Sequence, residues 1–530
     1  MRKNLDAIPG TLPALLARHM NSAAPALIDR GRRVSFQELA DESRRVAQGL
    51  RQAGVQPGDR VALWLPNVPA WLATFLACAQ LGAIAVSVNT RFRSQELADI
   101  LQRSQARVLL FWPEFKGIDF AGILAGCDAR ALEQLRTIVA YDETGAQAPP
   151  MMLGRSALSY MSLARSAPQL DDCAAPESGC AIFTTSGTTR APKFVLHDQR
   201  TVIRHAFDVV KGFSVDREST LLLAPPLCGV FGFCIAMAAL AAGRPSVLSP
   251  AWNAEQAAKD IVAHRITHIN ATDEVAAQLL DIGGLSFSNI RFFGYAAFNP
   301  AHADIVRRAD AHGLKLVGLY GASELQALLS RQDENAPVAA RALAGGRPVS
   351  SVAIVRARDP ETGTILPHGA PGELEFFAPS SRMVGYYGNP QATQDAFAAD
   401  GFYRSGDLGH TLADGRFVFL TRMGDALRLG GFLVSPAEIE AAVQEIPGIA
   451  ACQVVALSRA EGLLPVAFVV LQHGAALDEA AAIAHVASRL ARFKVPRRVF
   501  PIDAFPVTPG ANATKIQKGK LRDMAEALLH

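Results

Sequence analysis

The chain has 530 residues, of which 50% are hydrophobic and 19% are charged, so wholesale disorder is excluded. Its 52 Lys and Arg residues nearly balance 49 Asp and Glu residues, and a chain with this net charge of +3 is not built around a polyanion-binding surface. Its seven cysteines include no Cys-x-x-Cys pair, which argues against a disulfide framework and against a zinc ribbon.

The two ends of the chain carry no targeting signal that we recognise. The first residues do not lead into an apolar stretch, and the last residues lack a Ser-Lys-Leu peroxisomal address. We therefore expect no signal peptide, reduced thiols and a cytoplasmic location.

In the first two thirds of the chain, short apolar strands alternate with helices, which is typical of parallel sheets covered by helices. The predicted strands include 61–65, 83–88, 108–111 and 315–319, and the predicted helices include 36–53, 70–81 and 301–311. The uncharged runs 61–90 and 219–243 contain Pro and Gly, so we interpret them as buried α/β core and predict no transmembrane segment.

From about Gly345 the pattern changes to strands between turns, which predicts a small antiparallel, barrel-like β section. After Arg422 a small α+β unit is predicted, with helices over 436–445 and 477–491 and strands over 451–456 and 466–471. The expected fold class is therefore α/β: a large N-terminal domain of layered sheets plus the β section (1–421), a hinge (422–424), and a mobile C-terminal domain (425–530).

A loop rich in Gly and hydroxyl residues, TTSGTTRAPK over 184–193, follows the apolar strand 180–183. Such a loop can turn several N–H groups and hydroxyls toward one anion, and Lys193 adds a charge. Its spacing differs from G-x-x-x-x-G-K-[ST], which disfavours a P-loop NTPase. A Ser/Thr-rich surface turn is the alternative interpretation.

The loop resembles the phosphate-binding loop of the adenylate-forming enzymes, which include acyl- and aryl-CoA synthetases, firefly-type luciferases and nonribosomal adenylation domains. Further segments match that superfamily in the same order along nearly the whole chain: YGASE (320–324), GYY (385–387), P-x-x-T (390–393), YRSGD (403–407), RMGDALRLGGF (422–432) and TKIQK (514–518). The chain is identified as a member, of the acyl- or aryl-CoA synthetase type.

The resemblance implies an ATP-dependent acid-thiol ligase that makes an acyl-adenylate from a small-molecule carboxylic acid and transfers the acyl group to CoA. ATP, Mg²⁺ and CoA are the implied cofactors and co-substrates, a homodimer is allowed, and no nucleic acid is expected. Two alternatives stay open: a ligase that loads a carrier protein, and a degenerate nucleotide-binding regulatory homologue. A luciferase-type oxygenase is disfavoured.

The resemblance also assigns roles to single residues. Lys515 would bridge the carboxylate and the α-phosphate, Ser323 would bond the α-phosphate, and Glu324 would coordinate Mg²⁺. The remaining assignments are phosphate binding by Thr185, Ser186, Gly187, Thr188, Thr189 and Lys193, and adenine or ribose binding by Tyr320, Gly321, Asp407 and Arg422. Against these roles, Lys515 could be a solvated lysine, Asp407 a turn residue, and Glu324 a charge that opens a helix over 324–330.

The acyl pocket, the CoA channel and the hinge are assigned in the same way. Gly229, Phe231, Tyr295, Ala296 and Ala297 would line the acyl pocket, Gly430, Gly431 and Phe432 would contact CoA, and Gly424 would be the hinge. Asp273 and Glu274 could favour a cationic or hydrogen-bond-donating acid, but we favour Thr272 as the N-cap of a helix with acidic residues in its first turn.

Four positions depart from the family pattern: Arg190 and Phe194 replace glycines, and Gly229 and Gly424 replace larger side chains. The charge is also unevenly spread. The segment 489–522 contains nine basic residues and one acid, which predicts a mobile cationic lid over ATP, pyrophosphate and the phosphates of CoA.

Overall fold

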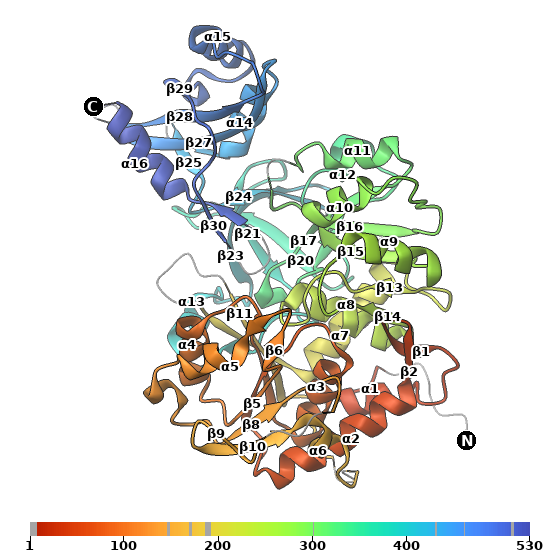
Figure 1. The fold of residues 1–530 in the computed structure, drawn as a ribbon. Coiled ribbons are helices and arrows are strands. Elements are labelled where there is room, and N and C mark those ends of the chain that lie inside the picture. Colours follow the sequence, from red (N-terminus) through yellow and green to blue (C-terminus); the bar gives the residue numbers. More distant parts are fainter. Residues whose placement is uncertain are drawn as a thin grey trace.

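The computed structural model describes residues 8–145, 149–168, 172–185, 192–299, 302–429, 432–459, 462–509 and 514–529. Two large sheets with helices between and around them form the main body, and a smaller unit made by the last part of the chain stands beside it (Figure 1). This arrangement confirms the α/β class, with a large N-terminal and a small C-terminal part.

The nine-stranded sheet is mainly parallel and has the order β22-β12-β11-β4-β3-β5-β8-β10-β9. Antiparallel strands β12, β22 and β9 lie at its two edges. Its strands are β3 (Arg60–Trp64), β4 (Ile84–Ser87), β5 (Val108–Phe111), β8 (Thr137–Ala140), β9 (Met151–Met152), β10 (Arg155–Ser159), β11 (Gly179–Thr184), β12 (Phe194–Asp198) and β22 (Gly385–Tyr386).

The 13-stranded sheet has the order β2-β1-β14-β13-β15-β16-β17-β18-β19-β24-β23-β21-β20. It is parallel from β1 to β17, and the strands from β18 onward continue it with antiparallel pairing. Its strands are β1 (Pro25–Asp29), β2 (Arg32–Ser35), β13 (Leu221–Leu222), β14 (Ser246–Leu248), β15 (His268–Thr272), β16 (Phe292–Ala296), β17 (Leu316–Tyr320), β18 (Ser330–Arg331), β19 (Gly345–Pro348), β20 (Ile354–Arg358), β21 (Gly372–Phe377), β23 (Tyr403–Thr411) and β24 (Phe417–Arg422).

Two nearly uncharged helices, α3 (Pro69–Leu81) and α8 (Val230–Ala242), are buried almost along their whole length. Both contribute to the largest hydrophobic core, where Trp71, Phe75 and Phe233 contact one another. These helices come from the two uncharged runs, which are therefore core. Among the described residues, no helix is both long and apolar enough to cross a bilayer.

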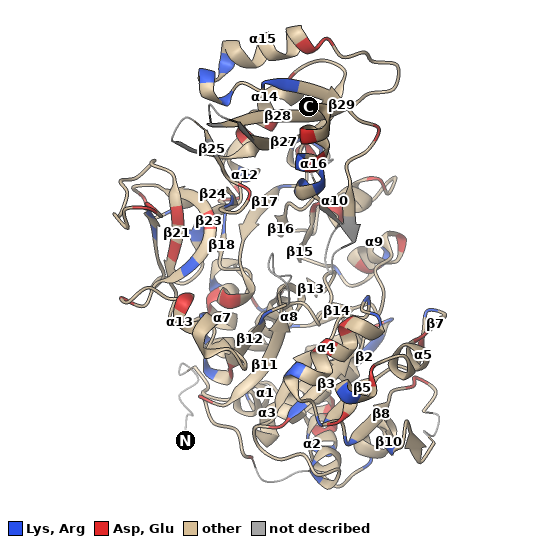
Figure 2. Cartoon of the chain, turned by 90° about the vertical axis from the view of Figure 1, so that its left-hand side faces the viewer, with Lys and Arg blue, Asp and Glu red and all other residues tan. Residues whose placement is uncertain are grey.

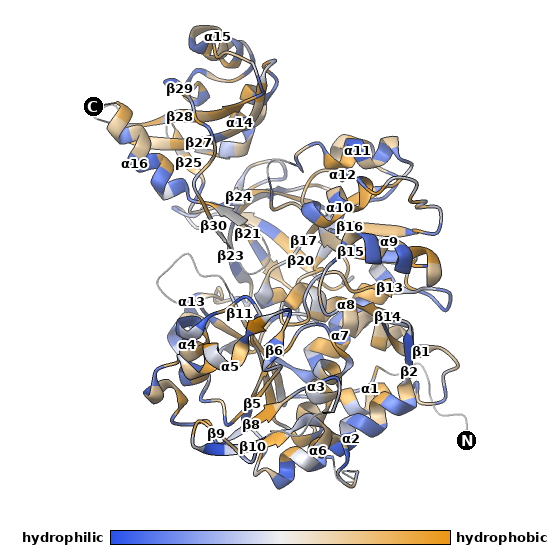
Figure 3. Ribbon diagram, viewed as in Figure 1, coloured by the Kyte–Doolittle hydropathy of each residue, from blue (hydrophilic) through white to orange (hydrophobic). Residues whose placement is uncertain are grey.

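The outer helices are amphipathic instead. In Figure 3, α2 (Phe36–Gln52) and α9 (Ala254–Ala263) carry hydrophilic residues on one side, whereas strands such as β16 are largely hydrophobic. The other helices of the body are α1 (Leu12–Ala17), α4 (Ser94–Ser104), α5 (Phe120–Ala125), α6 (Tyr160–Ala164), α7 (Gln199–Gly212), α10 (Asp273–Leu280), α11 (Ile305–Ala311), α12 (Val338–Arg341) and α13 (Pro390–Asp395).

The smaller unit has its own core and its own short sheets. Figure 2 shows basic residues at the beginning of α16, at the end of this helix that lies toward the main body. The elements of the unit are β25 (Leu427–Leu429), β26 (Phe432–Val434), α14 (Pro436–Gln444), β27 (Ile449–Arg459), β28 (Gly462–Leu471), α15 (Glu479–Arg489), β29 (Arg498–Pro501), β30 (Val507–Pro509), β31 (Thr514–Ile516) and α16 (Lys518–Leu528).

Candidate active site

The predicted adenine- and ribose-binding residues meet on the 13-stranded sheet. Tyr320 is the last residue of β17, and its hydroxyl donates to Asp407 Oδ2 on β23 at 2.5 Å. Its ring stacks on Phe376, with the ring centroids 5.3 Å apart. The pairing of β23 with β24 places Arg422 opposite Asp407. The structure therefore brings together three residues that the sequence separates widely.

Asp407 is buried, with 2% of its surface exposed, and only one of its two carboxylate oxygens has a hydrogen-bond donor. Arg422 Nη1 lies 3.0 Å from Oδ1, but Oδ1 has no partner in hydrogen-bonding geometry. Burial raises the pKa of Asp407 to about 6, against the opposing effects of the Arg422 charge and the Tyr320 hydrogen bond. A buried carboxylate oxygen with a free lone pair fits the hydroxyl donors of a ribose.

The turn after β17 is tight. Gly321 has no Cβ, and an added Cβ would lie 2.6 Å from the backbone of Ala327. The N–H groups of Leu325 and Ala327 both donate to the Ala322 carbonyl oxygen. We predicted a helix over 324–330, and this prediction is wrong. A three-residue 3₁₀ turn, Ser323–Leu325, is followed by three left-handed residues, with φ of 58°, 39° and 33° at 326–328, which end any helix.

This turn presents Glu324, the predicted magnesium ligand. Glu324 Oε1 accepts a hydrogen bond from the Tyr386 hydroxyl at 2.8 Å. His197 on β12 lies beneath the turn, and its Nε2 donates to the Ser323 carbonyl oxygen at 2.8 Å. Because burial lowers the pKa of His197 to about 4, this ring is neutral at physiological pH. Sequence reasoning missed both Tyr386 and His197, although Tyr386 stands in the matched GYY segment.

The ends of the predicted phosphate loop pair with each other. The Thr185 N–H donates to the Lys193 carbonyl oxygen at 2.9 Å, and the Lys193 N–H donates to Thr185 Oγ1 at 3.3 Å. Lys193 Nζ lies 4.6 Å from the centroid of the Tyr386 ring. Phe194 begins β12 and is buried in the core, so its bulk is accommodated outside the loop. The other loop positions, Ser186, Gly187, Thr188, Thr189 and Arg190, lie outside the described residues.

A cavity of about 1180 Å³ lies between the main body and the smaller unit. Phe231 of α8 lines it, as do Trp252 and the loop Pro225–Pro226, and Phe505 and Ile516 line it from the smaller unit. Gly229 is the N-cap residue of α8, next to Cys228 in the cavity wall. The cavity thus has walls from both parts of the molecule.

Three predicted pocket residues lie elsewhere. Tyr295 on β16 is buried, and its hydroxyl donates to the Ala342 carbonyl oxygen at 2.9 Å. Neither Tyr295 nor Ala296 nor Ala297 is in the described wall of the cavity. The Tyr295 hydroxyl that we expected to face an acid therefore has a protein acceptor, and the roles of these residues stay predictions.

The acidic residues at the cavity rim already have partners in the protein: Asp273 binds backbone N–H groups, and Glu274 binds His302. Thr272 Oγ1 accepts from the Val275 N–H at 3.3 Å and caps α10, as predicted. Asp273 Oδ2 accepts from the N–H groups of Phe298 and Asn299 at 2.8 and 2.6 Å. Since these hydrogen bonds already use its carboxylate, Asp273 has a structural role here, and a cationic acid is not required to explain it.

The residues assigned to the hinge, to CoA binding and to adenylation lie after β24 and in the smaller unit. Gly424 follows β24 in an open turn, where an added Cβ would meet nothing within 4 Å. Lys515 is in β31 and pairs with Thr508 of β30, and its side chain is outside what the structure describes. The same applies to the Phe432 side chain, and Gly430 and Gly431 lie outside the described residues.

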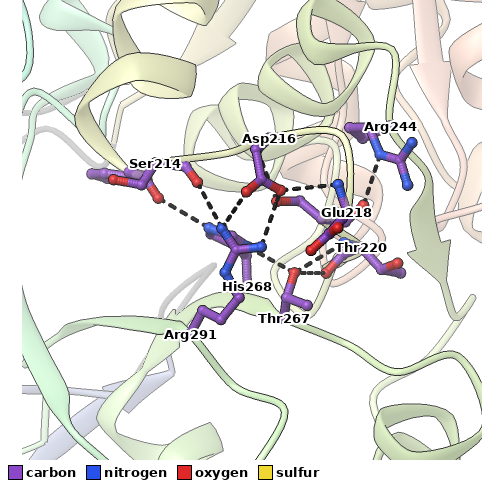
Figure 4. Close-up of polar contacts among 10 residues, drawn as sticks. Ser214, Asp216, Glu218, Thr220, Arg244, Thr267, His268 and Arg291 are labelled. Carbon is purple, nitrogen blue, oxygen red and sulfur yellow. Dashed lines mark hydrogen bonds and ion pairs between the residues drawn. The ribbon is translucent and has the colours of Figure 1, made fainter.

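A second polar cluster lies at the other end of the same parallel strands, where β13, β15 and β16 begin (Figure 4). Arg291 binds both oxygens of Asp216, at 3.0 and 2.6 Å, and this hydrogen bonding lowers the pKa of Asp216. His268 Nε2 donates to the Phe213 carbonyl oxygen at 2.9 Å, and its Nδ1 lies 2.8 Å from Thr267 Oγ1. We call this group the Asp216 cluster.

Comparison with known proteins gives consistent matches along the chain. The model described as AMP-binding enzyme matches residues 16–387, and that of the AMP-binding enzyme C-terminal domain matches residues 438–511. The 3-[(3aS,4S,7aS)-7a-methyl-1,5-dioxo-octahydro-1H-inden-4-yl]propanoyl:CoA ligase of Mycobacterium tuberculosis (strain ATCC 25618 / H37Rv) is 31% identical over 99% of this chain and 100% of its own. Feruloyl-CoA synthase of Amycolatopsis sp is 30% identical, over 97% and 98%. ATP-bound MatB from Rhodopseudomonas palustris shares the fold, with a TM-score of 0.82, 24% identity and coverage of 98% and 100%.

Proposed function

The chain belongs to the AMP-binding enzyme family, and we propose that it acts as an AMP-forming acid:CoA ligase on a bulky, largely apolar carboxylic acid. As a ligase of this family it uses ATP to make an acyl-adenylate and CoA to accept the acyl group. A carboxylate needs this activation because its anionic oxygen is a poor leaving group, whereas AMP is a good one.

The cavity is the observation that carries the choice of acid. Its volume of about 1180 Å³ is above the usual range of small-molecule pockets. Its wall includes the rings of Phe231, Trp252 and Phe505 among polar and charged residues such as Arg91 and Glu274. Aromatic walls of this kind favour a ring-bearing or branched acid over a two- or three-carbon acid. The named activities of the two CoA-forming relatives, on an indane-type propanoate and on ferulate, support the same substrate class.

The geometry around Asp407 supports its ribose role, and the resemblance of the motifs supports the other nucleotide roles. We infer that Asp407 Oδ1 accepts from the ribose hydroxyls beside Arg422, and that Tyr320 packs along the adenine. Thr185 and Lys193 would hold phosphate oxygens at the two ends of the loop, and Ser323 would bond the α-phosphate. Lys515 would balance the negative charge that builds up when the carboxylate attacks the α-phosphorus.

Glu324 fits a magnesium ion that is held mainly by its nucleotide. Among the described residues, no group of three or more His, Cys, Asp or Glu side chains is arranged to hold a metal. Magnesium commonly keeps several waters and takes one carboxylate plus substrate phosphates, which matches one half-buried carboxylate beside a phosphate loop. The ion would neutralise charge on the triphosphate.

A panel of acids tests the substrate class. The enzyme is incubated with ATP, Mg²⁺, CoA and one acid at a time, and both pyrophosphate and acyl-CoA are measured. We expect kcat/KM for an indane-type or arylpropenoic acid to exceed that for acetate by at least about 100-fold. Comparable values for acetate would contradict a bulky substrate.

The same assay separates the alternatives. Pyrophosphate release without acyl-CoA would point to an acceptor other than CoA, such as a carrier protein. A regulatory homologue would bind nucleotide without releasing pyrophosphate. If adenylation survived intact in Lys515→Ala, the role proposed for Lys515 would be wrong. The hinge at Gly424, the contacts of the segment 430–432 with CoA, a homodimer and a cytoplasmic location stay predictions from the sequence.

A further inference from the structure

Tyr386 lies between the phosphate loop and the Glu324 turn. It is on β22, and the pairing of β22 with β12 sets Tyr386 opposite Val195, two residues after Lys193. Its N–H donates to Thr393 Oγ1 at 2.8 Å, and the residue is buried, with 6% of its surface exposed. Backbone pairing and burial therefore fix the position of this side chain.

The ring and the hydroxyl of Tyr386 contact two groups of opposite charge. The hydroxyl donates to Glu324 Oε1 at 2.8 Å, and the ring face receives Lys193 Nζ at 4.6 Å from its centroid. The phenol is the donor of this bond, because an ionised carboxylate can only accept. One rigid side chain thus contacts both the Glu324 carboxylate and the Lys193 ammonium group and fixes their relative positions.

Other residues hold the backbone at Glu324. The Met383 N–H donates to the Glu324 carbonyl oxygen at 2.7 Å, and His197 Nε2 donates to the Ser323 carbonyl oxygen at 2.8 Å. The backbone of the turn is therefore held without the Tyr386 hydroxyl. The Tyr386 hydroxyl instead orients the side-chain carboxylate of Glu324.

We propose that Tyr386 is a positioning residue, which directs the Glu324 carboxylate toward a magnesium–triphosphate and holds the Lys193 ammonium group beside the same phosphates. This inference rests on the proposed function. Tyr386 acts through Glu324 and Lys193 and contacts no reacting atom. Its hydroxyl serves the metal-dependent part of nucleotide binding, and its ring serves the part that does not need the metal.

Two variants separate these parts. Tyr386→Phe removes the hydroxyl and keeps the ring, and Tyr386→Leu removes both. The affinity for a non-hydrolysable ATP analogue is measured by calorimetry, once with Mg²⁺ and once with EDTA. We expect Tyr386→Phe to bind about fivefold more weakly with Mg²⁺ and equally well with EDTA, because only the carboxylate loses its orienting bond.

Tyr386→Leu should lose about a further threefold in both conditions, because the ring no longer holds the cation. Tyr387→Phe is the matched control. Tyr387 is the next residue, and its ring is 5.9 Å from the Arg60 guanidinium carbon, away from Glu324 in the contacts described. This control should bind the analogue as the wild type does in both conditions.

The result with Tyr386→Phe decides the matter. Wild-type affinity with Mg²⁺, or an equal loss with and without Mg²⁺, would overturn the positioning role, the latter because general damage to the site explains it. The thermal unfolding midpoint of each variant is measured alongside. If the wild-type protein itself failed to bind the analogue, the proposed function would fail first, and the role of Tyr386 with it.

Discussion

The parallel strands of the 13-stranded sheet carry polar residues at both ends, and the two ends differ in how fully these residues are paired. Where β13, β15 and β16 begin, Asp216 has both oxygens bound and His268 has a partner at each nitrogen. Beside the end of β17, the buried Asp407 Oδ1 on the neighbouring part of the sheet has no partner in hydrogen-bonding geometry. We call this second end the open end, because a buried unpaired acceptor can take a hydrogen bond from a ligand.

This difference indicates which end of the sheet contributes to stability and which end binds a ligand. Paired buried groups stabilise a fold, whereas an unpaired buried acceptor costs free energy until something donates to it. The carboxyl ends of parallel strands are also where α/β proteins bind their ligands. We therefore expect substitutions at the open end to change activity, and substitutions of the buried Thr267 and His268 in the Asp216 cluster to change stability.

The largest effect is expected for Asp407→Ala. Removing the only ionised acceptor of the Tyr320–Asp407–Arg422 group should lower kcat/KM for ATP by about 100-fold, measured by pyrophosphate release. The thermal unfolding midpoint should fall only modestly, because the Tyr320 hydroxyl loses its acceptor while the cost of a buried charge is removed. A large drop in this midpoint would show that the open end stabilises the fold after all.

Thr267→Val should have the opposite profile. The valine removes the hydroxyl that accepts from the Thr220 N–H at 3.0 Å and lies beside His268 Nδ1, so buried groups lose their partners. We expect the free energy of unfolding to fall by about 2 kcal/mol in urea denaturation. The kcat of the folded variant should equal that of the wild type, and a lower kcat would contradict the division between the two ends.

The pH dependence of nucleotide affinity sharpens the comparison. Because the pKa of Asp407 is raised to about 6, its carboxyl is mostly protonated at pH 5 and ionised at pH 7. Affinity for ATP should therefore rise about tenfold between these values, as the acceptor gains its charge. Folding stability should change in the other direction, since a raised pKa favours the folded state at low pH.

The control for that titration is Asp407→Asn, whose side chain does not ionise. Its affinity, measured by calorimetry across the same range, should be weak and nearly flat. A tenfold rise in the asparagine variant would assign the titration to another group.

The smallest effect is expected for Arg291→Ala. Its ion pair with Asp216 is partly exposed, with 39% and 48% of the two side chains accessible, so it should contribute less than about 1 kcal/mol. Pyrophosphate release should be unchanged. A loss above about 2 kcal/mol in the free energy of unfolding would mean that the Asp216 cluster behaves as a buried network.

The sequence predicts which residues of the candidate nucleotide site lie close together, because short motifs carry them. Tyr320, Asp407 and Arg422 meet as such motifs imply, and the two buried helices follow from the uncharged runs. The fold class follows from the alternation of strands and helices. Each element can be recognised because the spacing of its apolar residues differs between a strand and a helix.

Interactions between distant backbone segments are what the sequence hides. The predicted helix over 324–330 fails because the backbone of Ala327 returns against Gly321, a contact that local propensity does not encode. The role of Tyr386 depends on the pairing of β22 with β12, which are far apart in the chain. Alternation along β16 could have placed Tyr295 on the face of Phe293, in the second hydrophobic core.

The pairing of β22 with β12 has a consequence for the order in which the protein gains its activity during synthesis. The hydrogen bonds that complete the site join residues 62 and 87 positions apart, from Tyr386 to Glu324 and from Tyr320 to Asp407. Contacts between residues so far apart in the sequence form late in folding, because a long loop must close before they can be made. A nascent chain that still lacks β22 and β23 can collapse around α3 and α8, but it has no complete nucleotide site until those strands leave the ribosome.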